Sequence, residues 1–162
     1  MAALTDQQTL ALTMWAEARQ IPRSDPRDHS PVEELLAVGC VVRNRLPHPE
    51  RWRATDASYK AICLAPRQFS CWNDGTDANH VALLDQARLL VDPFAAPVLL
   101  RSPDPEVREC LHLASGIITG VIIDRTNGAT SYWAPAMVPP GRIPEWAVGK
   151  PILQIGDQNF LS

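Results

Sequence analysis

The 162-residue sequence lacks the features that mark several classes of protein. No run approaches the ~20 apolar residues needed to span a bilayer, so we expect no membrane insertion. Residues 1–6 hold neither a basic region nor a long apolar stretch, so we expect no signal peptide. Lysine and arginine form no block, and the net charge is −3. Because neutralising phosphates takes clustered cations, this argues against a nucleic acid partner.

Patterns of metal and thiol chemistry are missing too. Without an HExxH motif or histidines at i, i+4, we expect no metal ion, no cofactor and no zinc-dependent amidase or peptidase. The histidines are expected at the surface or at helix ends: His29, His48, His80 and His112. The cysteines form no CxxC pair, and Cys40 and Cys110 fall in apolar helical patterns typical of buried thiols. Cys63 and Cys71 could form a disulfide in an oxidising compartment, and nothing places a histidine beside Cys71 to activate a thiol nucleophile.

The composition is that of one globular domain, which we place at residues 1–162. With 46% apolar and 20% charged residues, the chain is long enough to bury its own core. Helices are expected over residues 5–19, 32–46, 58–63, 77–90 and 105–119. Short strands are expected over residues 130–133 and 152–155, the first after the tight-turn signal Asn127-Gly128. The expected fold class is α+β, mainly α, with a small C-terminal β element.

The helix over residues 32–46 is apolar all round in its middle, which predicts a central helix buried on all sides. Its small residues permit close approach of neighbouring helices: Ala37, Gly39 and Cys40. At its C-terminal end, Asn44 and Arg45 either cap the helix or fix a wall of the active site. The two later helices are expected to bury one stripe each: Val81, Leu84 and Ala87 in the first, and Val107, Leu111, Ala114 and Ile118 in the second.

The first helix carries a carboxyl group where a helix normally buries hydrocarbon. Thr5 begins a capping box, and Leu10, Met14 and Glu17 share one helical face. Desolvation raises the pKa of such a carboxyl group, so it can stay protonated near neutral pH and donate a proton. Glu17 is therefore the candidate general acid. The alternative is an ion pair with Arg19 or another cation at the edge of the stripe.

Five short segments follow one another along the chain. They are Glu17-Ala18-Arg19, the helix over 32–46, Gln68-Phe69-Ser70, residues 128–135 with the sequence G-A-T-S-Y-W-A-P, and residues 155–160 with the sequence I-G-D-Q-N-F. In this order they resemble the cell wall hydrolase family typified by the spore cortex-lytic enzymes, over residues 10 to 160. The resemblance implies a helical domain like those of lysozymes and lytic transglycosylases.

The sequence departs from the family pattern at several positions. Ala16 and Gln20 stand where the family usually has glycine, and Ala134 replaces an asparagine, so any contact made by that amide is absent here. Asp157-Gln158-Asn159 replaces the stretch around a usual histidine. These departures keep open a non-catalytic alternative, namely a wall-binding or structural module of a phage particle.

The resemblance also implies a reaction. It implies that the chain is a peptidoglycan lytic transglycosylase that cleaves the β-1,4 bond between N-acetylmuramic acid and N-acetylglucosamine. Glu17 would be its single catalytic carboxyl group, acting as both general acid and general base. An attacking C6 hydroxyl from the substrate needs no water-positioning base, because its effective concentration is already high. The alternative, a hydrolytic muramidase, needs a second carboxyl group, and the candidates are Asp74, Asp77 and Asp124.

Residues near these motifs are suited to binding sugar. Neutral hydrogen bonds are offered by Gln68, Ser70 and Asn73, and apolar faces by Phe69, Trp72, Tyr132 and Trp133. The alternatives place Phe69 and Trp133 in the core and Asn73 in a simple turn.

The overall organisation resembles that of a phage endolysin, a bacteriolytic enzyme released through membrane holes. It would act as a monomer on peptidoglycan glycan strands. It would remain in the host cytoplasm until the holes admit it to the periplasm.

Overall fold

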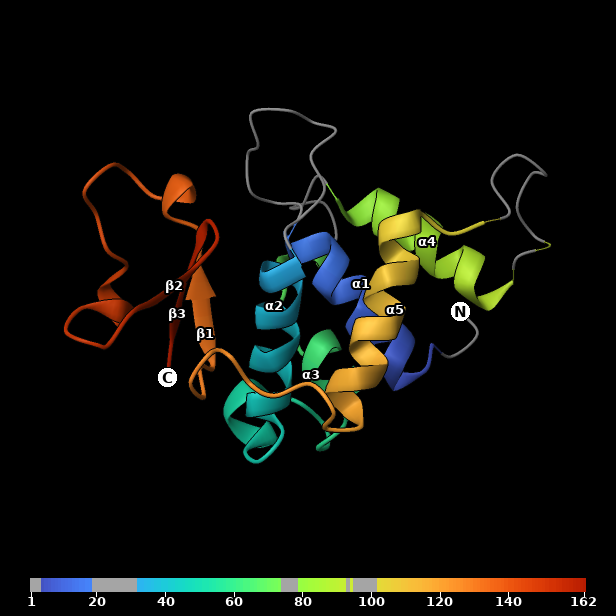
Figure 1. Ribbon diagram of the computed structural model, residues 1–162, viewed down its shortest axis with the longest axis horizontal. Helices are drawn as coiled ribbons and strands as arrows, with labels where there is room; N and C mark the ends of the chain where they lie inside the picture. Colours follow the sequence, from blue (N-terminus) through green and yellow to red (C-terminus); the bar gives the residue numbers. More distant parts are fainter. Residues whose placement is uncertain (1–3, 19–31, 74–78, 93, 95–101) are drawn as a thin grey trace.

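The computed structural model describes residues 4–18, 32–73, 79–92, 94 and 102–162, and shows a helical body with a small sheet on one side (Figure 1). The mainly helical α+β fold is confirmed. The described α-helices are α1 (Asp6–Ala18), α2 (Val32–Arg45), α3 (Tyr59–Leu64), α4 (His80–Val91) and α5 (Pro105–Ile118). Short 3-10 turns are η1 (Pro49–Trp52), η2 (Ser70–Trp72), η4 (Pro135–Met137) and η5 (Glu145–Ala147), and the strands are β1 (Ser131–Trp133), β2 (Leu153–Ile155) and β3 (Gln158–Leu161). No helix in the described ranges has the length and apolar character needed to cross a membrane.

Helix α1 begins with the predicted capping box. The Thr5 amide donates to Gln8 Oε1 at 2.9 Å, and the Gln8 amide donates to Thr5 Oγ1 at 3.2 Å. Every residue from Thr9 to Ala18 is buried, and the hydroxyls of Thr9 and Thr13 donate to carbonyls one turn back. Because α1 packs against α2, α3, α4 and α5, it shares the central position that we expected for α2 alone.

Close packing of the helices depends on Gly39 in α2. A Cβ atom at this position would collide with Ile117 Cδ1 of α5 and lie 2.9 Å from Met14 Sδ of α1. Both neighbours are ends of flexible side chains, which would have to move to admit a larger residue. The prediction that small residues in α2 allow close approach is confirmed at this position.

The predicted inner faces of α4 and α5 contain errors. In α4, Val81 is 69% exposed, and the buried residues are Leu83, Ala87 and Leu89. In α5, Ile118 is exposed, and the buried apolar stripe is Val107, Cys110, Ala114 and Ile117. The assignments of Val81 and Ile118 were wrong because both helices carry apolar residues on either side of the stripe. The pattern alone does not show which border faces the neighbouring helices.

All four cysteines are buried and free, so Cys63 and Cys71 form no disulfide. Burial in apolar surroundings raises the pKa of the Cys63 thiol to about 12. Burial also raises the pKa values of the Cys40 and Cys110 thiols. The prediction that Cys40 and Cys110 are buried thiols is confirmed.

The sheet is antiparallel, with the strand order β1-β3-β2. The predicted turn before β1 is confirmed, since Asn127 and Gly128 have φ angles of 55° and 76°. The central strand, β3, was not predicted as a strand. It lies where the closing I-G-D-Q-N-F motif ends, and its Phe160 pairs with Tyr132 on one side and Leu153 on the other.

Helix α2 anchors the sheet, which lies beside it in Figure 1. The fully buried Glu34 accepts a hydrogen bond from the Asp157 amide at 2.6 Å, in the turn between β2 and β3. Arg45 Nε donates to the Thr130 carbonyl at 2.8 Å. Asn44 Nδ2 donates to three oxygens ahead of β1, on Asp124, Thr126 and Ala129. Asn44 and Arg45 therefore fix the chain leading into β1.

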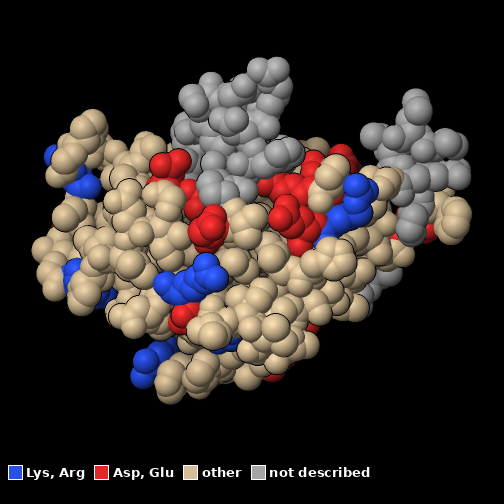
Figure 2. Space-filling view, viewed as in Figure 1, with Lys and Arg blue, Asp and Glu red and all other residues tan. Residues whose placement is uncertain are grey.

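The basic side chains of the described residues are dispersed over the face shown in Figure 2, whereas most of its acidic side chains gather in the upper part. Most of this face is uncharged, and its basic groups lie apart from one another. The dispersal on this face follows the sequence, in which lysine and arginine form no block.

Candidate active site

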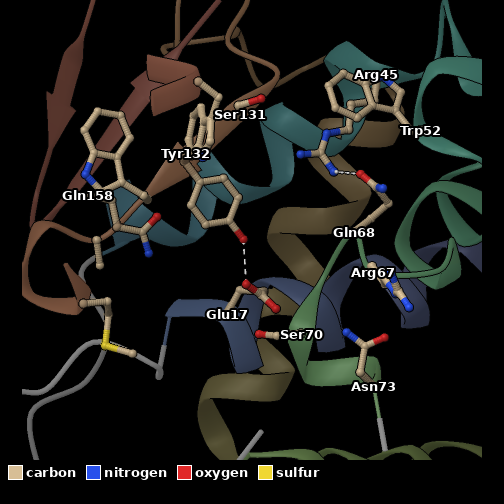
Figure 3. A pocket seen from close by; sticks show the side chains of 14 residues that line it. Glu17, Arg45, Trp52, Arg67, Gln68, Ser70, Asn73, Ser131, Tyr132 and Gln158 are labelled. Carbon is tan, nitrogen blue, oxygen red and sulfur yellow. Dashed lines mark hydrogen bonds between the residues drawn. The ribbon is translucent and has the colours of Figure 1, made fainter. Parts of the chain in front are cut away.

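A cleft of about 600 Å³ opens between the helical body and the sheet (Figure 3). Its walls come from the end of α1, the end of α2, the segment after α3, and the β element. The described residues that line it are Glu17, Arg45, Trp52, Arg67, Gln68, Ser70, Asn73, Ser131, Tyr132, Trp133, Ala134, Met137, Trp146 and Gln158. Each of the five segments noted in the sequence contributes to this lining.

Glu17 lies in the last turn of α1 and is 7% exposed. Its Oε2 atom accepts a hydrogen bond from the Tyr132 hydroxyl at 2.8 Å (Figure 3), and its Oε1 atom accepts one from the Cys71 amide at 3.2 Å. Donors on both oxygens restrict rotation of the carboxyl group. Among the described lining residues, Glu17 is the one that carries a carboxyl group.

Tyr132 is held in place by the sheet. Its ring stacks on that of Phe160 in β3, with centroids 5.6 Å apart and an interplanar angle of 29°. Burial of the hydroxyl, together with the negative charge of Glu17, raises the pKa of Tyr132 well above its ordinary value of 10. The hydroxyl therefore stays protonated and donates to Glu17 throughout the neutral range.

Arg45 connects three parts of the cleft wall. Its guanidinium lies over the Trp52 ring at 4.3 Å and the Phe69 ring at 4.9 Å, and its Nη1 atom donates to Gln68 Oε1 at 3.4 Å. Burial lowers the pKa of Arg45, whereas Tyr132, Cys63 and Glu17 favour its charged form. Arg45 is thus a cation within electrostatic reach of Glu17. The other predicted partner of Glu17, Arg19, lies outside the described residues.

Most of the predicted sugar-binding residues lie in the cleft. Gln68, Ser70, Asn73, Tyr132 and Trp133 all line it. Trp133 is also 9% exposed and packs edge-on against Trp146, so it belongs to both core and cleft.

Phe69 and Trp72 were predicted as sugar-binding faces, and the structure contradicts this. Phe69 is 1% exposed in the core beneath Arg45, and it is not among the lining residues. Trp72 packs against the core and donates from Nε1 to Thr13 Oγ1 at 2.9 Å. Both rings support the cleft from behind, because the short 3-10 turn at residues 70–72 directs them toward α1 and α2.

Sequence reasoning missed several lining residues. The residues not predicted to bind substrate are Trp52, Arg67, Ser131, Ala134, Met137, Trp146 and Gln158. Arg45 was predicted only as a residue that fixes the wall of the site. Trp146 carried a signal, because a tryptophan in a proline-rich irregular loop has little core to fill; it is 47% exposed. No such signal in the sequence marked Arg67, because its position follows from a left-handed backbone conformation with φ 64°.

Asp124, the described candidate for a second carboxyl group, does not line the cleft. Burial raises its pKa, but hydrogen bonds from Thr126, Gly128 and Asn44 outweigh this and bring the pKa to about 2. Asp124 therefore organises the turn before β1. The other two candidates, Asp74 and Asp77, lie outside the described residues.

No described histidine is among the residues that line the cleft. His80 Nδ1 is 2.9 Å from the Cys71 carbonyl, His48 is 3.6 Å from Glu50, and His112 is exposed. His29 lies outside the described residues. No group of three His, Cys, Asp or Glu residues among the described ones could hold a metal ion.

Comparisons with known proteins agree with the fold. Among solved structures, the fold is similar to the catalytic domain of the germination-specific lytic transglycosylase SleB from Bacillus anthracis, with a TM-score of 0.56. The two share 18% sequence identity, and the match covers 100% of this chain and 99% of the other. A comparison with curated protein sequences gives no match.

The family comparison covers most of the chain. The profile of the Cell Wall Hydrolase family matches residues 29–161. Glu17 precedes this span, so its assignment depends on the cleft geometry and on the resemblance seen in the sequence. The chain belongs to the cell wall hydrolase family and is an enzyme that degrades peptidoglycan.

Proposed function

We propose that this enzyme cleaves the β-1,4 bond between N-acetylmuramic acid and N-acetylglucosamine as a lytic transglycosylase. Glu17 acts first as general acid and protonates the oxygen of the leaving sugar. As a carboxylate it then takes the proton from the C6 hydroxyl of the muramic residue. That hydroxyl attacks C1 and closes a 1,6-anhydro ring. The bond from C1 to the oxygen of the leaving sugar breaks, and a bond from C1 to O6 forms within the muramic residue.

The observation that carries this proposal is the buried carboxyl group of Glu17, which lines the cleft and has a donor on each oxygen. Among the described lining residues, no other one carries a carboxyl group that could act as nucleophile or water base. An intramolecular hydroxyl removes the need for such a partner. The hydrogen bonds from Tyr132 and Cys71 stabilise the carboxylate that forms after the first proton transfer.

The remaining lining suits a glycan strand. Gln68, Ser70 and Asn73 provide neutral hydrogen-bonding groups on one side of Glu17, and tryptophan rings provide apolar surface for sugar faces. The resemblance in fold to SleB, described as a lytic transglycosylase, supports the same reaction.

Product analysis tests the proposal. Digestion of purified peptidoglycan should release muropeptides about 18 Da lighter than their hydrated forms, because no water is added when the anhydro ring closes. Mass spectrometry of the soluble fraction measures this difference. Fragments with reducing N-acetylmuramic acid ends would identify a muramidase, with Asp74 or Asp77 as its second carboxyl group. Free stem peptides beside intact glycans would reject both glycosidase reactions.

A further inference from the structure

Gln158 has an unusual place for a polar side chain. It begins β3, is 1% exposed, and still lines the cleft (Figure 3). Its Oε1 atom is buried and has no hydrogen-bond partner among the residues that the structure describes. A buried acceptor without a partner destabilises the free protein, and native folds retain few of them. An acceptor of this kind in the wall of a substrate cleft points to a donor on the substrate.

The register of the sheet places Gln158 next to the reacting groups. Gln158 and Phe160 are two residues apart in β3, so they share one face of the sheet, and Tyr132 is paired with Phe160 on that face. Gln158 therefore lies on the same side of the sheet as the hydroxyl that donates to Glu17. In Figure 3, Gln158 and Arg67 lie on opposite sides of the Glu17–Tyr132 pair.

The surroundings identify the kind of donor. On the β-element side, the cleft is lined by apolar residues, which are Trp133, Ala134, Met137 and Trp146. A donor attached to an apolar group suits this mixed lining better than a hydroxyl with its own lone pairs. Among the groups of a glycan strand, the acetamido substituent combines an N–H donor with a methyl group.

We propose that Gln158 is the residue that recognises the acetamido N–H of a sugar bound next to the scissile bond. Gln158 accepts the hydrogen bond, and the apolar lining contacts the acetyl methyl group. The amide plane of Gln158 turns about its last side-chain bond to present Oε1, a rotation with a soft energy profile. This inference depends on the proposed cleavage of glycan strands and adds a determinant for N-acetylated sugars.

The test compares Gln158→Met with wild type on two forms of peptidoglycan, one fully N-acetylated and one treated with an N-deacetylase. Gln158→Met keeps the volume and removes the acceptor, so the melting temperature should stay the same or rise. On N-acetylated peptidoglycan, kcat/KM should fall at least tenfold, because a site built to bond a donor loses that bond. On the deacetylated form, the difference in kcat/KM between wild type and variant should be much smaller, since the apolar lining that suits the acetyl methyl group disfavours a protonated amine.

Gln154→Met is the matched control. Gln154 lies in β2 of the same hairpin, is exposed, and does not line the cleft. Its variant should match wild type on both substrates. A fall in the melting temperature of Gln158→Met with unchanged kcat/KM would show a structural role and overturn the inference. An equal loss on both substrates would also overturn it, because Gln158 would then bond another group.

The two proposals can fail separately. If wild type releases glycan fragments but Gln158→Met changes kcat/KM equally on both substrates, glycan cleavage stands and the assignment of Gln158 fails. If wild type releases only stem peptides, glycan cleavage fails and the assignment of Gln158 fails with it.

Discussion

At the scale of single residues, the site depends on how Tyr132 and Cys71 hold the Glu17 carboxyl group. One donor contacts each oxygen, at 2.8 Å and 3.2 Å. Because the raised pKa of Tyr132 keeps its hydroxyl protonated, that donor is present throughout the neutral range. Orientation of this kind is a recognised part of general acid catalysis, since the acid must point at the atom it protonates.

Replacing Tyr132 with phenylalanine tests this role. Tyr132→Phe keeps the ring that stacks on Phe160 and removes the donor to Glu17, so we expect kcat to fall by about ten- to a hundredfold. Steady-state lysis of purified peptidoglycan measures the loss.

Tyr59→Phe is the control for Tyr132→Phe, because Tyr59 is the other tyrosine, is buried, and does not line the cleft. It should retain wild-type kcat. Similar rates for the two variants would show that Tyr132 does not position Glu17.

At the scale of elements, the cleft exists because the β2–β3 turn docks on the start of α2. Glu34 is fully buried and accepts from the Asp157 amide, and Gly156 in the same turn has a φ of 55°. A Cβ atom at Gly156 would collide with the Glu34 carboxylate, so glycine is required both for space and for its backbone angle. This contact places β3, and β3 in turn supports Tyr132 and presents Gln158.

Removing the Glu34 carboxylate should loosen the sheet. Glu34→Ala loses a buried, charge-assisted hydrogen bond, so we expect a loss of about 1.5–3 kcal/mol in unfolding free energy and a lower kcat/KM. Chemical denaturation measures the first quantity and lysis kinetics the second. Glu33→Ala, in the same turn of α2 but exposed, should change neither by much. Unaltered stability in Glu34→Ala would mean that the sheet is held by its apolar contacts alone.

Elements with local signals could be predicted from the sequence, whereas tertiary detail could not. The capping box at Thr5 and the cap at Asp104 could be predicted, because both use residues close together in the sequence. Asp104 accepts a hydrogen bond from the Glu106 amide at 2.8 Å. The burial of Phe69 and the exposure of Val81 depend on how distant helices pack, and both predictions were wrong. Strand β3 was missed because the polar Gln158 and Asn159 interrupt its apolar pattern, although the sheet pairs them in its centre.

The site was predictable to a similar degree. Glu17 stood out because a carboxyl group is rare on a buried helix, and five of the seven predicted sugar-binding residues line the cleft. Gln158 and Arg67 could not be assigned, because only the folded sheet and a left-handed backbone bring them to the cleft.

At the scale of the whole molecule, the core holds several groups that resist ionisation. Burial raises the pKa of Cys63 to about 12 from its ordinary value of 9.0. Above pH 9 the unfolded chain releases this proton while the folded chain keeps it, so folding stability falls as pH rises toward 12. Below pH 9 both states keep the proton, and the thiol contributes no pH dependence.

The size of this effect follows from the linkage relation. Between pH 9 and 12, Cys63 should lower the unfolding free energy by about 1.4 kcal/mol per pH unit. Chemical denaturation at successive pH values measures the slope, and Cys63→Ala should have a slope shallower by that amount. Equal slopes in the two proteins would show that the buried thiol ionises without unfolding.

Peptidoglycan is the substrate class of the family whose profile matches residues 29–161 of the chain. The monomeric state, the phage endolysin origin, and passage from host cytoplasm to periplasm stay predictions from the sequence. They concern where the enzyme meets the wall, and the chemistry of the cleft does not depend on them.

The central claim, that Glu17 performs the proton transfers, is tested most directly by Glu17→Gln. The variant keeps the shape of the side chain and one acceptor oxygen but cannot donate and recover a proton at neutral pH. Lysis of purified peptidoglycan should fall by at least 10²–10⁴-fold, with a melting temperature within a few degrees of wild type. Glu106→Gln, at a buried glutamate outside the cleft, should stay active. Lysis by Glu17→Gln at a rate close to wild type would contradict the account.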